Sequence, residues 1–420
     1  MDIKKLLLGI RGCKCGRDHI CPIETVEISE NASAALAKCA EAYKRILIVY
    51  DENTYCAASA SVESALVGHS PERLIYKRSS VLVPDERAIE ELESALPEEA
   101  DLIVGVGSGV INDLCKYVSF LRGIPYFIYA TAPSMDGYAS VGAALILGGM
   151  KVTKNAHVPT AIFADPRVLT NAPIDMIRAG FGDIIGKYSC LSDWRLAAVV
   201  LDEYICERVV SLTYDAVEET VKLADGIVKR NPSSVAALME SLVSVGILMA
   251  YVGNSRPASG SEHHYSHYFE IVGIIRGEEY LPHGIDVCCS AIECAALRDK
   301  ILSVDDIGAC KPRHNEKLWN EEIERIYGKV APEVKALQAK LGWYSQDRLP
   351  LYRERWDKIK EILSSTPSRD KMEALVAKIG LSYKSFCELY GETKLHDASL
   401  YAKDLKDRYT VLWLYYDLFV

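Results

Sequence analysis

The chain has 420 residues, more than one compact unit usually holds, so two domains are the default expectation. Hydrophobic residues make up 49% and charged residues 25% of it, a composition typical of globular proteins, which excludes a disordered or fibrous chain. Its formal net charge of -10 argues against a nucleic-acid binder, which needs a basic surface to neutralise phosphates. An anionic ligand must therefore be held by local dipoles, cations or a metal.

Cysteine is frequent, with 13 residues scattered from Cys13 to Cys387. An odd number without regular spacing is a poor disulfide framework, so we expect reduced thiols and a cytoplasmic protein. The apolar run before Arg11 is too short for a signal peptide. Residues 235–253 raise the question of a membrane span, but Glu240 and several serines dilute them, so we expect a buried helix and no span.

Residues 41–131 alternate short β-branched runs with amphipathic segments. The pattern predicts strands over 45–50, 74–77, 102–106 and 124–131, and helices over 56–67, 85–96 and from the glycine turn to 121. Asp85, which follows Pro84, is the expected N-cap of the second helix. This spacing indicates βαβ units and a parallel sheet.

From residue 174 to the C-terminus the periodicity is helical, with breaks at 231–232, 254–260, 277–282 and near Pro312. We therefore predict an α/β nucleotide-binding domain over residues 41–172 and a helical domain over 173–420. Residues 1–40 form an N-terminal extension that the pattern does not explain.

A glycine-rich turn, VGVGSG, ends at Gly109 between a predicted strand and a helix. Glycines there let backbone N–H groups approach a phosphate at the helix N-terminus, although a tight turn without any ligand also uses them. The turn departs from the usual dinucleotide fingerprint, because it follows at least two βα units and Tyr129 stands where an acid is expected.

Two further polar segments follow predicted strands. Asp51 ends the first strand, where it would accept the ribose hydroxyls of a dinucleotide or simply cap the next helix. The segment from Thr131 to Tyr138, TAPSMDGY, follows a later strand. Because ligands bind at the carboxyl ends of parallel strands, we expect it to form a pocket wall.

Histidines cluster near the middle of the helical region, at positions 263, 264, 267 and 283. His263 and His267 share a helix face, and His283 opens the next predicted helix. A divalent metal with an open position needs a third ligand, often a carboxylate. Asp183, in an otherwise apolar helical segment, is the best candidate, although it could instead be an N-cap after Gly182.

A rival cluster lies in the extension. Cys13, Cys15, His19 and Cys21 place four nitrogen and sulfur donors within nine residues, which could hold zinc. The spacing is not the paired C-x₂-C arrangement of a structural zinc finger, so the extension could equally leave these side chains exposed.

The chain resembles the dehydroquinate synthase-like and iron-containing alcohol dehydrogenase superfamily, and within it the AraM-like glycerol-1-phosphate dehydrogenases. Four segments carry the resemblance in the family's order: GVGSGVINDLCKY, TAPSMDGYAS, AGFGDIIGKYSCLSDW and SRPASGSEHHYSHYFE. It is close over residues 45–290 and looser in the helical C-terminus. It implies an N-terminal α/β NAD(P)-binding domain with a parallel sheet and an all-α metal-binding domain.

The resemblance also implies roles for individual residues. The metal ligands would be Asp183, His263 and His283, with His267 lining the substrate site as a proton-relay group and Asp136 binding substrate hydroxyls. The cofactor residues would be Gly107, Ser108 and Gly109 at the pyrophosphate, Thr131 and Ser134 beside the nicotinamide, and Asp51 at the ribose. Lys154 and Arg256 are the candidates for a substrate phosphate, although both could be ordinary surface cations.

The implied reaction is the reversible reduction of dihydroxyacetone phosphate to sn-glycerol 1-phosphate by NADH or NADPH at one divalent ion. Zinc is the expected ion, with nickel or iron as alternatives. The expected partner is a small phosphorylated substrate, and the expected assembly is a homo-oligomer, a dimer or larger.

Three alternatives differ at identifiable positions. A glycerol or other polyol dehydrogenase would leave Lys154 and Arg256 without a role. A dehydroquinate synthase carries Glu where this chain has Asp183, and a GGK lysine cluster where it reads MDGYASVGA. A non-catalytic NAD- or metal-binding relic is disfavoured because all three metal ligands are present.

Overall fold

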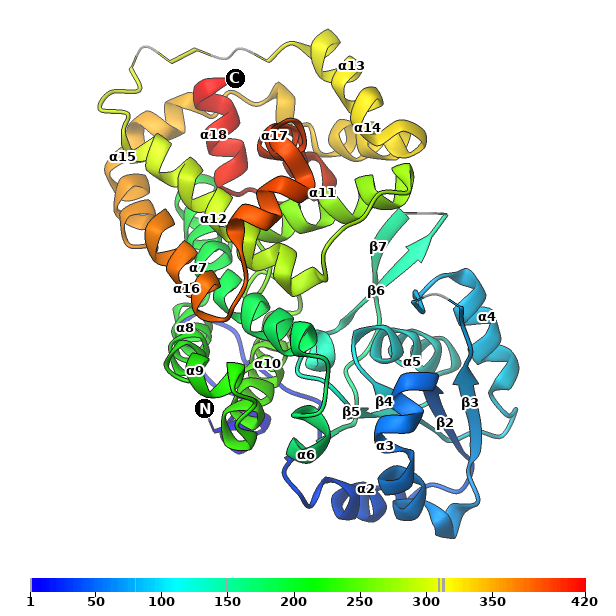
Figure 1. Ribbon diagram of the computed structural model, residues 1–420. Coiled ribbons are helices and arrows are strands. Elements are labelled where there is room, and N and C mark those ends of the chain that lie inside the picture. Colours follow the sequence, from blue (N-terminus) through cyan, green and yellow to red (C-terminus); the bar gives the residue numbers. More distant parts are fainter. Residues whose placement is uncertain (1, 80, 149, 309, 312–313) are drawn as a thin grey trace. The chain divides into compact units, whose positions relative to one another are not determined.

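The computed structural model describes residues 2–79, 81–148, 150–308, 310–311 and 314–420 (Figure 1). The chain forms two compact units: Met1–Ile184 with Ser211–Ser255, and Ile185–Val210 with Arg256–Val420. Helices α7 (Ile174–Leu201) and α8 (Glu207–Lys222) run through the division. The division therefore falls at 184/185 where the periodicity had predicted 172/173, and it groups residues 211–255 with the sheet.

A six-stranded parallel sheet organises the first unit, in the order β1-β8-β5-β4-β2-β3. Its strands are β1 (Thr25–Ile28), β2 (Ile46–Asp51), β3 (Glu72–Tyr76), β4 (Leu102–Gly107), β5 (Tyr126–Ala130) and β8 (Ala161–Ala164). The predicted α/β class with a parallel sheet is confirmed, and β2 to β5 match the predicted strands. The extension is part of the sheet, because β1 is an edge strand paired with β8.

Two strands form a separate antiparallel hairpin, β6 (Gly142–Leu147) with β7 (Met150–Asn155). The helices of this unit outside the two shared ones are α1 (Ile3–Leu7), α2 (Ala32–Ala40), α3 (Glu52–Ala65), α4 (Glu86–Ala95), α5 (Gly109–Arg122), α6 (Pro166–Leu169), α9 (Ala224–Val228) and α10 (Pro232–Val252), with short 3-10 turns η1 (Val67–His69) and η2 (Gly137–Ala139). Asp85 caps α4 as predicted, since its side chain accepts from Ala88 N.

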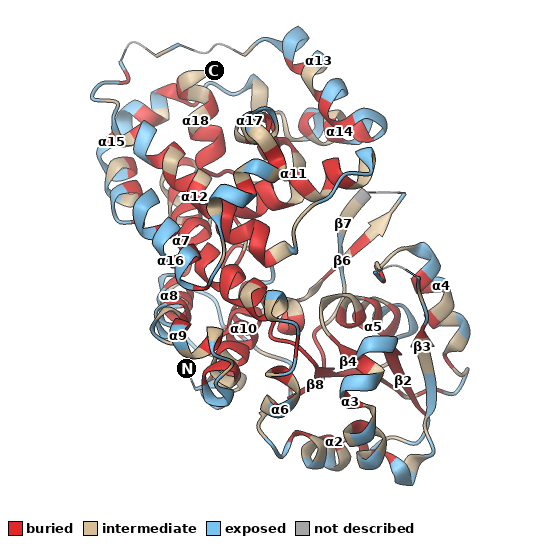
Figure 2. Ribbon diagram, viewed as in Figure 1, coloured by how far each residue is buried: buried red, intermediate tan, exposed pale blue. Residues whose placement is uncertain are grey.

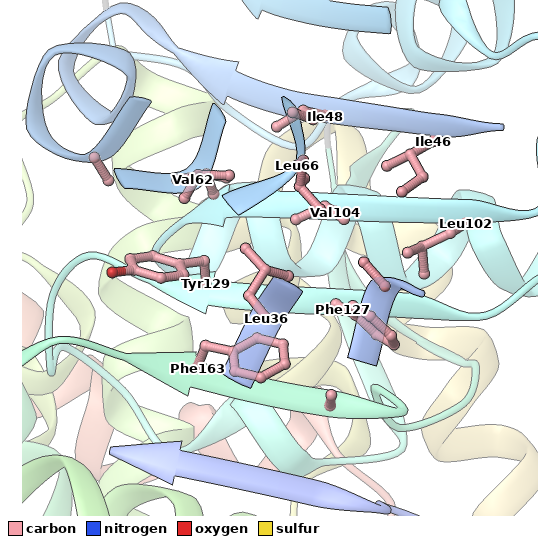
Figure 3. Close-up of a cluster of buried hydrophobic side chains, with 14 of the residues drawn as sticks. Leu36, Ile46, Ile48, Val62, Leu66, Leu102, Val104, Phe127, Tyr129 and Phe163 are labelled. Carbon is pink, nitrogen blue, oxygen red and sulfur yellow. The ribbon is translucent and has the colours of Figure 1, made fainter. Parts of the chain in front are cut away.

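The two faces of the sheet are covered by different helices. Alternate side chains of β2, β4 and β5, such as Ile48, Val104 and Phe127, pack with Leu36 of α2 and Val62 of α3 (Figure 3). On the opposite face, a Cβ added at Gly105 would lie 2.9 Å from Cys115 Sγ of α5. This arrangement leaves the carboxyl ends of the strands available for a ligand.

Helix α10 is long and apolar enough to cross a membrane by length and composition, but 78% of its apolar window is buried inside the protein. Figure 2 shows it among the most buried helices. Such burial is typical of a core helix, as predicted for residues 235–253.

The second unit is helical. Beside α7 it contains α11 (Ser261–Arg276), α12 (His283–Leu302), α13 (Glu316–Tyr327), α14 (Ala331–Leu341), α15 (Leu349–Ser364), α16 (Arg369–Lys378), α17 (Tyr383–Tyr401) and α18 (Val411–Phe419), with 3-10 turns η3 (Gly328–Val330), η4 (Trp343–Ser345) and η5 (Ala402–Leu405). Its core joins Leu196 of α7 to Trp356 of α15 and Trp413 of α18. The predicted break near Pro312 lies outside the described residues.

Candidate active site

The carboxyl ends of the parallel strands open into one pocket of about 1060 Å³. Asp51 after β2, Ser108 after β4, Thr131 after β5 and Asp165 after β8 all line it. The strand order reverses around β2 and β4, where such sheets bind dinucleotides. The volume lies just above the range of about 300–1,000 Å³ usual for ligand pockets.

Asp51 caps helix α3 and also lines the pocket, so its position is compatible with both roles considered for it, helix cap and ligand contact. Its Oδ1 accepts from Thr54 N at 2.9 Å, and the Thr54 hydroxyl lies 3.0 Å from Asp51 N, a reciprocal capping box that starts α3. The same residue lines the pocket. Because the cap bond from Thr54 N goes to Oδ1, the second carboxylate oxygen is the atom that a ligand hydroxyl would meet.

The glycine turn leads directly into α5, whose N-cap Ser108 makes no side-chain capping bond. Ser108 lines the pocket together with Val110 and Ile111, so the positive end of the helix dipole faces it. Gly107 has a packing reason of its own, because an added Cβ would lie 2.6 Å from Ile111 Cβ. Gly107 and Gly109 are not among the pocket-lining residues.

The segment from Thr131 to Ser140 is held by a buried lysine. Lys116 of α5 donates to Gly137 O at 2.8 Å, Gly142 O at 3.0 Å and Ser140 Oγ at 3.1 Å. Burial lowers the pKa of Lys116, while the Asp113 carboxylate, 3.7 Å away, opposes that shift. Three convergent acceptors give this ammonium a positioning role.

Two glycines set how closely helices approach the same segment. A Cβ at Gly180 of α7 would lie 1.8 Å from Pro133 O, and a Cβ at Gly246 of α10 would lie 2.7 Å from Asp136 O. Asp136 N donates to Asp183 Oδ2 at 2.9 Å. Ser134 is half-buried in this segment, beside the buried hydroxyl of Tyr138.

The histidines of α11 and α12 come together within the helical unit. The ring centroids of His263 and His283 are 5.0 Å apart, and that of His267 lies 6.3 Å from the first and 5.8 Å from the second. His263 Nδ1 lies 2.7 Å from Glu262 Oε1, and His283 Nδ1 lies 3.1 Å from Ser266 Oγ. Both hydrogen bonds leave Nε2 as the ligand atom, the usual arrangement at metal sites.

Asp183, His263 and His283 each offer one ligand atom, and these three atoms lie within 4.8 Å of one another. Asp183 stands on α7 immediately before the part of that helix that belongs to the histidines' unit, so helix continuity ties it to them. It is nearly fully buried, where a carboxylate needs a cation or strong hydrogen bonds. An oxygen and two imidazole nitrogens suit a divalent transition metal with an open position.

A buried carboxylate, that of Asp193, supports the start of α11. Asp193 Oδ2 accepts from Ser261 N at 2.7 Å, and its Oδ1 accepts from Val411 N at 2.7 Å. Burial, together with the nearby charge of Glu262, raises the pKa of Asp193 to about 6. The start of the metal-ligand helix is therefore anchored through an otherwise costly buried acid.

The two candidate phosphate cations differ in environment. Lys154 is exposed on β7. Arg256 is buried, its Nε donates to Glu203 Oε1 at 2.6 Å, a second guanidinium nitrogen pairs with Glu203 Oε2, and a third donates to Tyr409 O at 3.0 Å. A substrate phosphate would have to compete with this bidentate ion pair.

Sequence patterns did not single out Lys116, Glu262 or the arginines at the pocket. Arg78 and Arg167 line it, and each is paired, with Glu91 at 2.9 Å and with Asp165 at 2.6 Å. The signal available for Glu262 was its place beside His263 in SEHHYSH. For Lys116, a lysine within an apolar helix pattern was the only trace.

Comparison with known proteins places these features in a family. The family described as iron-containing alcohol dehydrogenase matches residues 27–173. A glycerol-1-phosphate dehydrogenase [NAD(P)+] of Bacillus licheniformis is 32% identical over 95% of this chain and 90% of its own length. The chain belongs to the glycerol-1-phosphate dehydrogenase family. The enzyme of that name from Halalkalibacterium halodurans is 31% identical over 96% of this chain and 94% of its own.

Solved structures of low sequence identity share the fold of this glycerol-1-phosphate dehydrogenase family member. The sulfoacetaldehyde reductase of Bifidobacterium kashiwanohense, in complex with NAD+, matches with a TM-score of 0.58 at 13% identity, covering 91% of each chain. The predicted superfamily and fold class are confirmed. An NAD(P) cofactor and a metal ion fit this family, and the pocket and the Asp183 group have the chemistry to hold them.

Proposed function

We propose that this chain catalyses the reversible reduction of dihydroxyacetone phosphate to sn-glycerol 1-phosphate with NADH or NADPH. The observation that carries the proposal is the similarity, over 95% of the chain, to a relative named for that activity. The donor set at Asp183 and the pocket at the sheet edge supply the chemistry that such a reduction needs. The enzyme thus acts on a small phosphorylated substrate.

The dinucleotide would occupy the pocket of the sheet. Backbone N–H groups at the start of α5 and the Ser108 hydroxyl face its pyrophosphate, with Gly107 and Gly109 giving the turn its shape. Asp51 would accept hydrogen bonds from the adenosine ribose hydroxyls, and Thr131 and Ser134 would lie on the nicotinamide side. Arg78 and Arg167 line the pocket, each already paired with a carboxylate, so a ribose phosphate would have to compete with Glu91 or Asp165 for them.

The metal would be held by Asp183 Oδ, His263 Nε2 and His283 Nε2, and zinc is our first candidate, with nickel or iron as alternatives. When bound, the nicotinamide supplies the hydride and the metal polarises the ketone oxygen. Glu262 and Ser266 fix the two imidazoles through their Nδ1 atoms. Asp183 also accepts from Asp136 N, which keeps its carboxylate oriented.

The substrate would lie beside His267 and Asp136. His267 is the candidate for delivering a proton to the alkoxide oxygen, because its imidazole lies next to the ligand histidines. Asp136 would accept hydrogen bonds from the hydroxyls of the substrate. Of the two phosphate candidates, Lys154 is exposed and forms no ion pair with another described residue, whereas Arg256 is already paired with Glu203.

We further propose a cytoplasmic homo-oligomer, since the cysteine-rich composition suits a reducing compartment. Analytical ultracentrifugation of the purified chain tests the assembly. A monomer at micromolar concentration would contradict it.

The activity is tested by following NADH oxidation with dihydroxyacetone phosphate and, separately, with dihydroxyacetone. We expect turnover with the phosphorylated ketone and little with the other. Turnover of dihydroxyacetone alone would favour a polyol dehydrogenase, and no turnover of either by metal-loaded protein would refute the dehydrogenase.

The ligand set is tested by Asp183→Ala and His263→Ala, with Asp175→Ala on the exposed first turn of α7 and His396→Ala on the exposed face of α17 as matched controls. We expect both ligand variants to lose the catalytic metal and activity, while NADH binding still quenches their tryptophan fluorescence. Full catalytic metal in both would refute the assignment. For the phosphate, Lys154→Met should raise the KM for dihydroxyacetone phosphate and leave that for NADH unchanged.

A further inference from the structure

The N-terminal segment folds into a closed loop that gathers cysteine and histidine side chains. Ile10 and His19 pair as an antiparallel bridge, with Ile10 N donating to His19 O at 2.8 Å and His19 N donating to Ile10 O at 2.9 Å. Between them, Gly16 N donates to Cys13 O at 2.9 Å, which forms a turn through Cys15. Gly16 takes φ +84°, a conformation that only glycine adopts readily.

Three donors from this loop and a fourth from a cysteine distant in the sequence form one group. Cys13, Cys15, His19 and Cys206 each offer one ligand atom, and all four atoms lie within 4.8 Å of one another. Cys206 immediately precedes α8 and belongs to the second unit, shortly before the first unit resumes at Ser211. Cys21, the fourth donor expected from the sequence, is not in the group.

The distance between Cys15 and His19 is close to that between two ligands of one zinc ion. Cys15 Sγ lies 3.3 Å from His19 Nε2. A thiolate and an imidazole bound to one tetrahedral zinc ion, at about 2.3 and 2.0 Å, would stand about 3.5 Å apart. No disulfide joins any of the described cysteines, and Cys13 and Cys15, one residue apart, are badly placed to form one.

His19 is oriented as a metal ligand is. It is almost fully buried, and its Nδ1 lies 3.1 Å from the carbonyl oxygen of Tyr251 at the end of α10. Donation from Nδ1 to that carbonyl leaves Nε2 with its lone pair directed to the sulfur atoms. The ring also stacks on Tyr251 with centroids 5.5 Å apart, and the Tyr251 hydroxyl donates to Leu6 O.

We propose that Cys13, Cys15, His19 and Cys206 bind a structural zinc ion, separate from the catalytic metal. Three thiolates and one imidazole complete a tetrahedral shell with no position for substrate, as in structural zinc sites. Soft sulfur donors favour zinc over the hard cations, in contrast to the oxygen and nitrogen set at Asp183. The ion replaces one proton on each coordinating thiol, and nothing is oxidised or reduced.

Helix α1 and strand β1, which flank the loop, already contact α10, and the ion would add coordinate bonds to these contacts. The loop carries few buried apolar side chains, with Leu6 and Ile23 the nearest, so it lacks a core of its own. Coordination would tie it to Cys206, and the Nδ1 atom of His19 ties it to the carbonyl oxygen of Tyr251 at the end of α10. Strand β1, at the edge of the sheet, follows this loop in the sequence. The ion would therefore also restrain the segment that leads into β1.

The decisive measurement uses full-length protein produced in minimal medium with cobalt in place of zinc. Cobalt bound to thiolates absorbs strongly in the near ultraviolet by sulfur-to-metal charge transfer, and the Asp183 set has no thiolate. We expect this band in the parent and, undiminished, in Asp183→Ala. Protein without the band, although cobalt-loaded, would overturn the proposal.

Variants locate the band. Cys206→Ser and Cys15→Ser should lose it together with one equivalent of metal per chain, whereas Cys21→Ser, a partly exposed cysteine outside the group, should keep both. Asp183→Ala should retain one equivalent of zinc, and Asp183→Ala combined with Cys206→Ser should retain none.

If the Cys206 variants do not fold, the parent still decides the matter. A thiol-specific mercurial should release one equivalent of zinc to a colorimetric chelator. Release of no zinc, or a disulfide among Cys13, Cys15 and Cys206 detected by mass spectrometry in protein purified under argon, would overturn the proposal.

Discussion

The close approach of α7 to the segment at Thr131–Ser140 can be tested by one methyl group. In Gly180→Ala the new Cβ would stand 1.8 Å from Pro133 O, about 1.6 Å short of the 3.4 Å at which ordinary contact begins. Neither atom belongs to a flexible side-chain end, so backbone must move. The segment that carries Ser134 and Asp136 is the mobile partner, because α7 is a long buried helix.

The cost divides unequally between stability and activity. Overpacking costs about 1–3 kcal/mol, while replacing a helical glycine by alanine returns about 1 kcal/mol, so we expect a net loss of about 0–2 kcal/mol in unfolding free energy. A displacement of about 1 Å at a reacting centre costs about a hundredfold in rate, near 2.7 kcal/mol. Activity should therefore fall further than stability.

A graded series makes the reasoning refutable. Gly246→Ala, whose Cβ would lie 2.7 Å from Asp136 O, should lose about tenfold in kcat/KM, and Gly68→Ala, which meets nothing within 4 Å, should lose none. The assay is NADH oxidation with dihydroxyacetone phosphate, with urea unfolding and metal content measured on the same samples. A kcat/KM for Gly180→Ala within twofold of the parent, or the same loss in all three variants, would show that this contact does not position the segment.

Three further perturbations test other parts of the molecule. Asp51→Ala should lower stability by about 1 kcal/mol through the lost cap of α3 and should raise the KM for NADH, whereas Asp51→Ser should restore only the thermal midpoint; recovery of both would deny Asp51 a cofactor role. Lys116→Met removes three donated hydrogen bonds and should lower both unfolding free energy, by about 3 kcal/mol, and kcat/KM; unchanged stability would refute its positioning role. Burial lowers the pKa of Lys403 to about 8 from 10.5, so between those pH values the folded state binds fewer protons than the unfolded state and unfolding free energy should rise by up to about 3 kcal/mol. Lys403→Met should lack that rise in urea titrations, and equal slopes would contradict the assignment.

The sheet could be predicted where its strands are buried on both faces. β2 and β4 are continuous apolar runs bounded by turn residues, and this local pattern is sufficient. β1 and β8 are only four residues each, and β1 is half-buried along its length, so their identity depends on pairing with each other across the chain. The hairpin β6–β7 was not predicted either, although its two strands are adjacent in sequence and pair with each other.

The candidate site likewise contains residues that the local sequence pattern could predict and residues that it could not. Asp51, Ser108 and Thr131 follow predicted strands, and the geometry of a parallel sheet brings such positions to one edge. No local pattern shows that Lys116 finds three acceptors or that Cys206 replaces Cys21 in the zinc group. Those contacts exist only once distant helices are packed, which a single sequence does not encode in its periodicity.

The net charge of -10 leaves the protein to bind two anions against its own field. The described arginines at the pocket and before α11 do not resolve this alone, because Arg78, Arg167 and Arg256 are each paired with a carboxylate. Such pairs keep the guanidinium in place but cancel most of its long-range attraction. Under the proposed function, the backbone N–H groups at the start of α5, an ion at Asp183 and the exposed Lys154 would supply the positive potential that these ion pairs do not. We therefore expect phosphate recognition to depend on short-range geometry rather than on a basic surface.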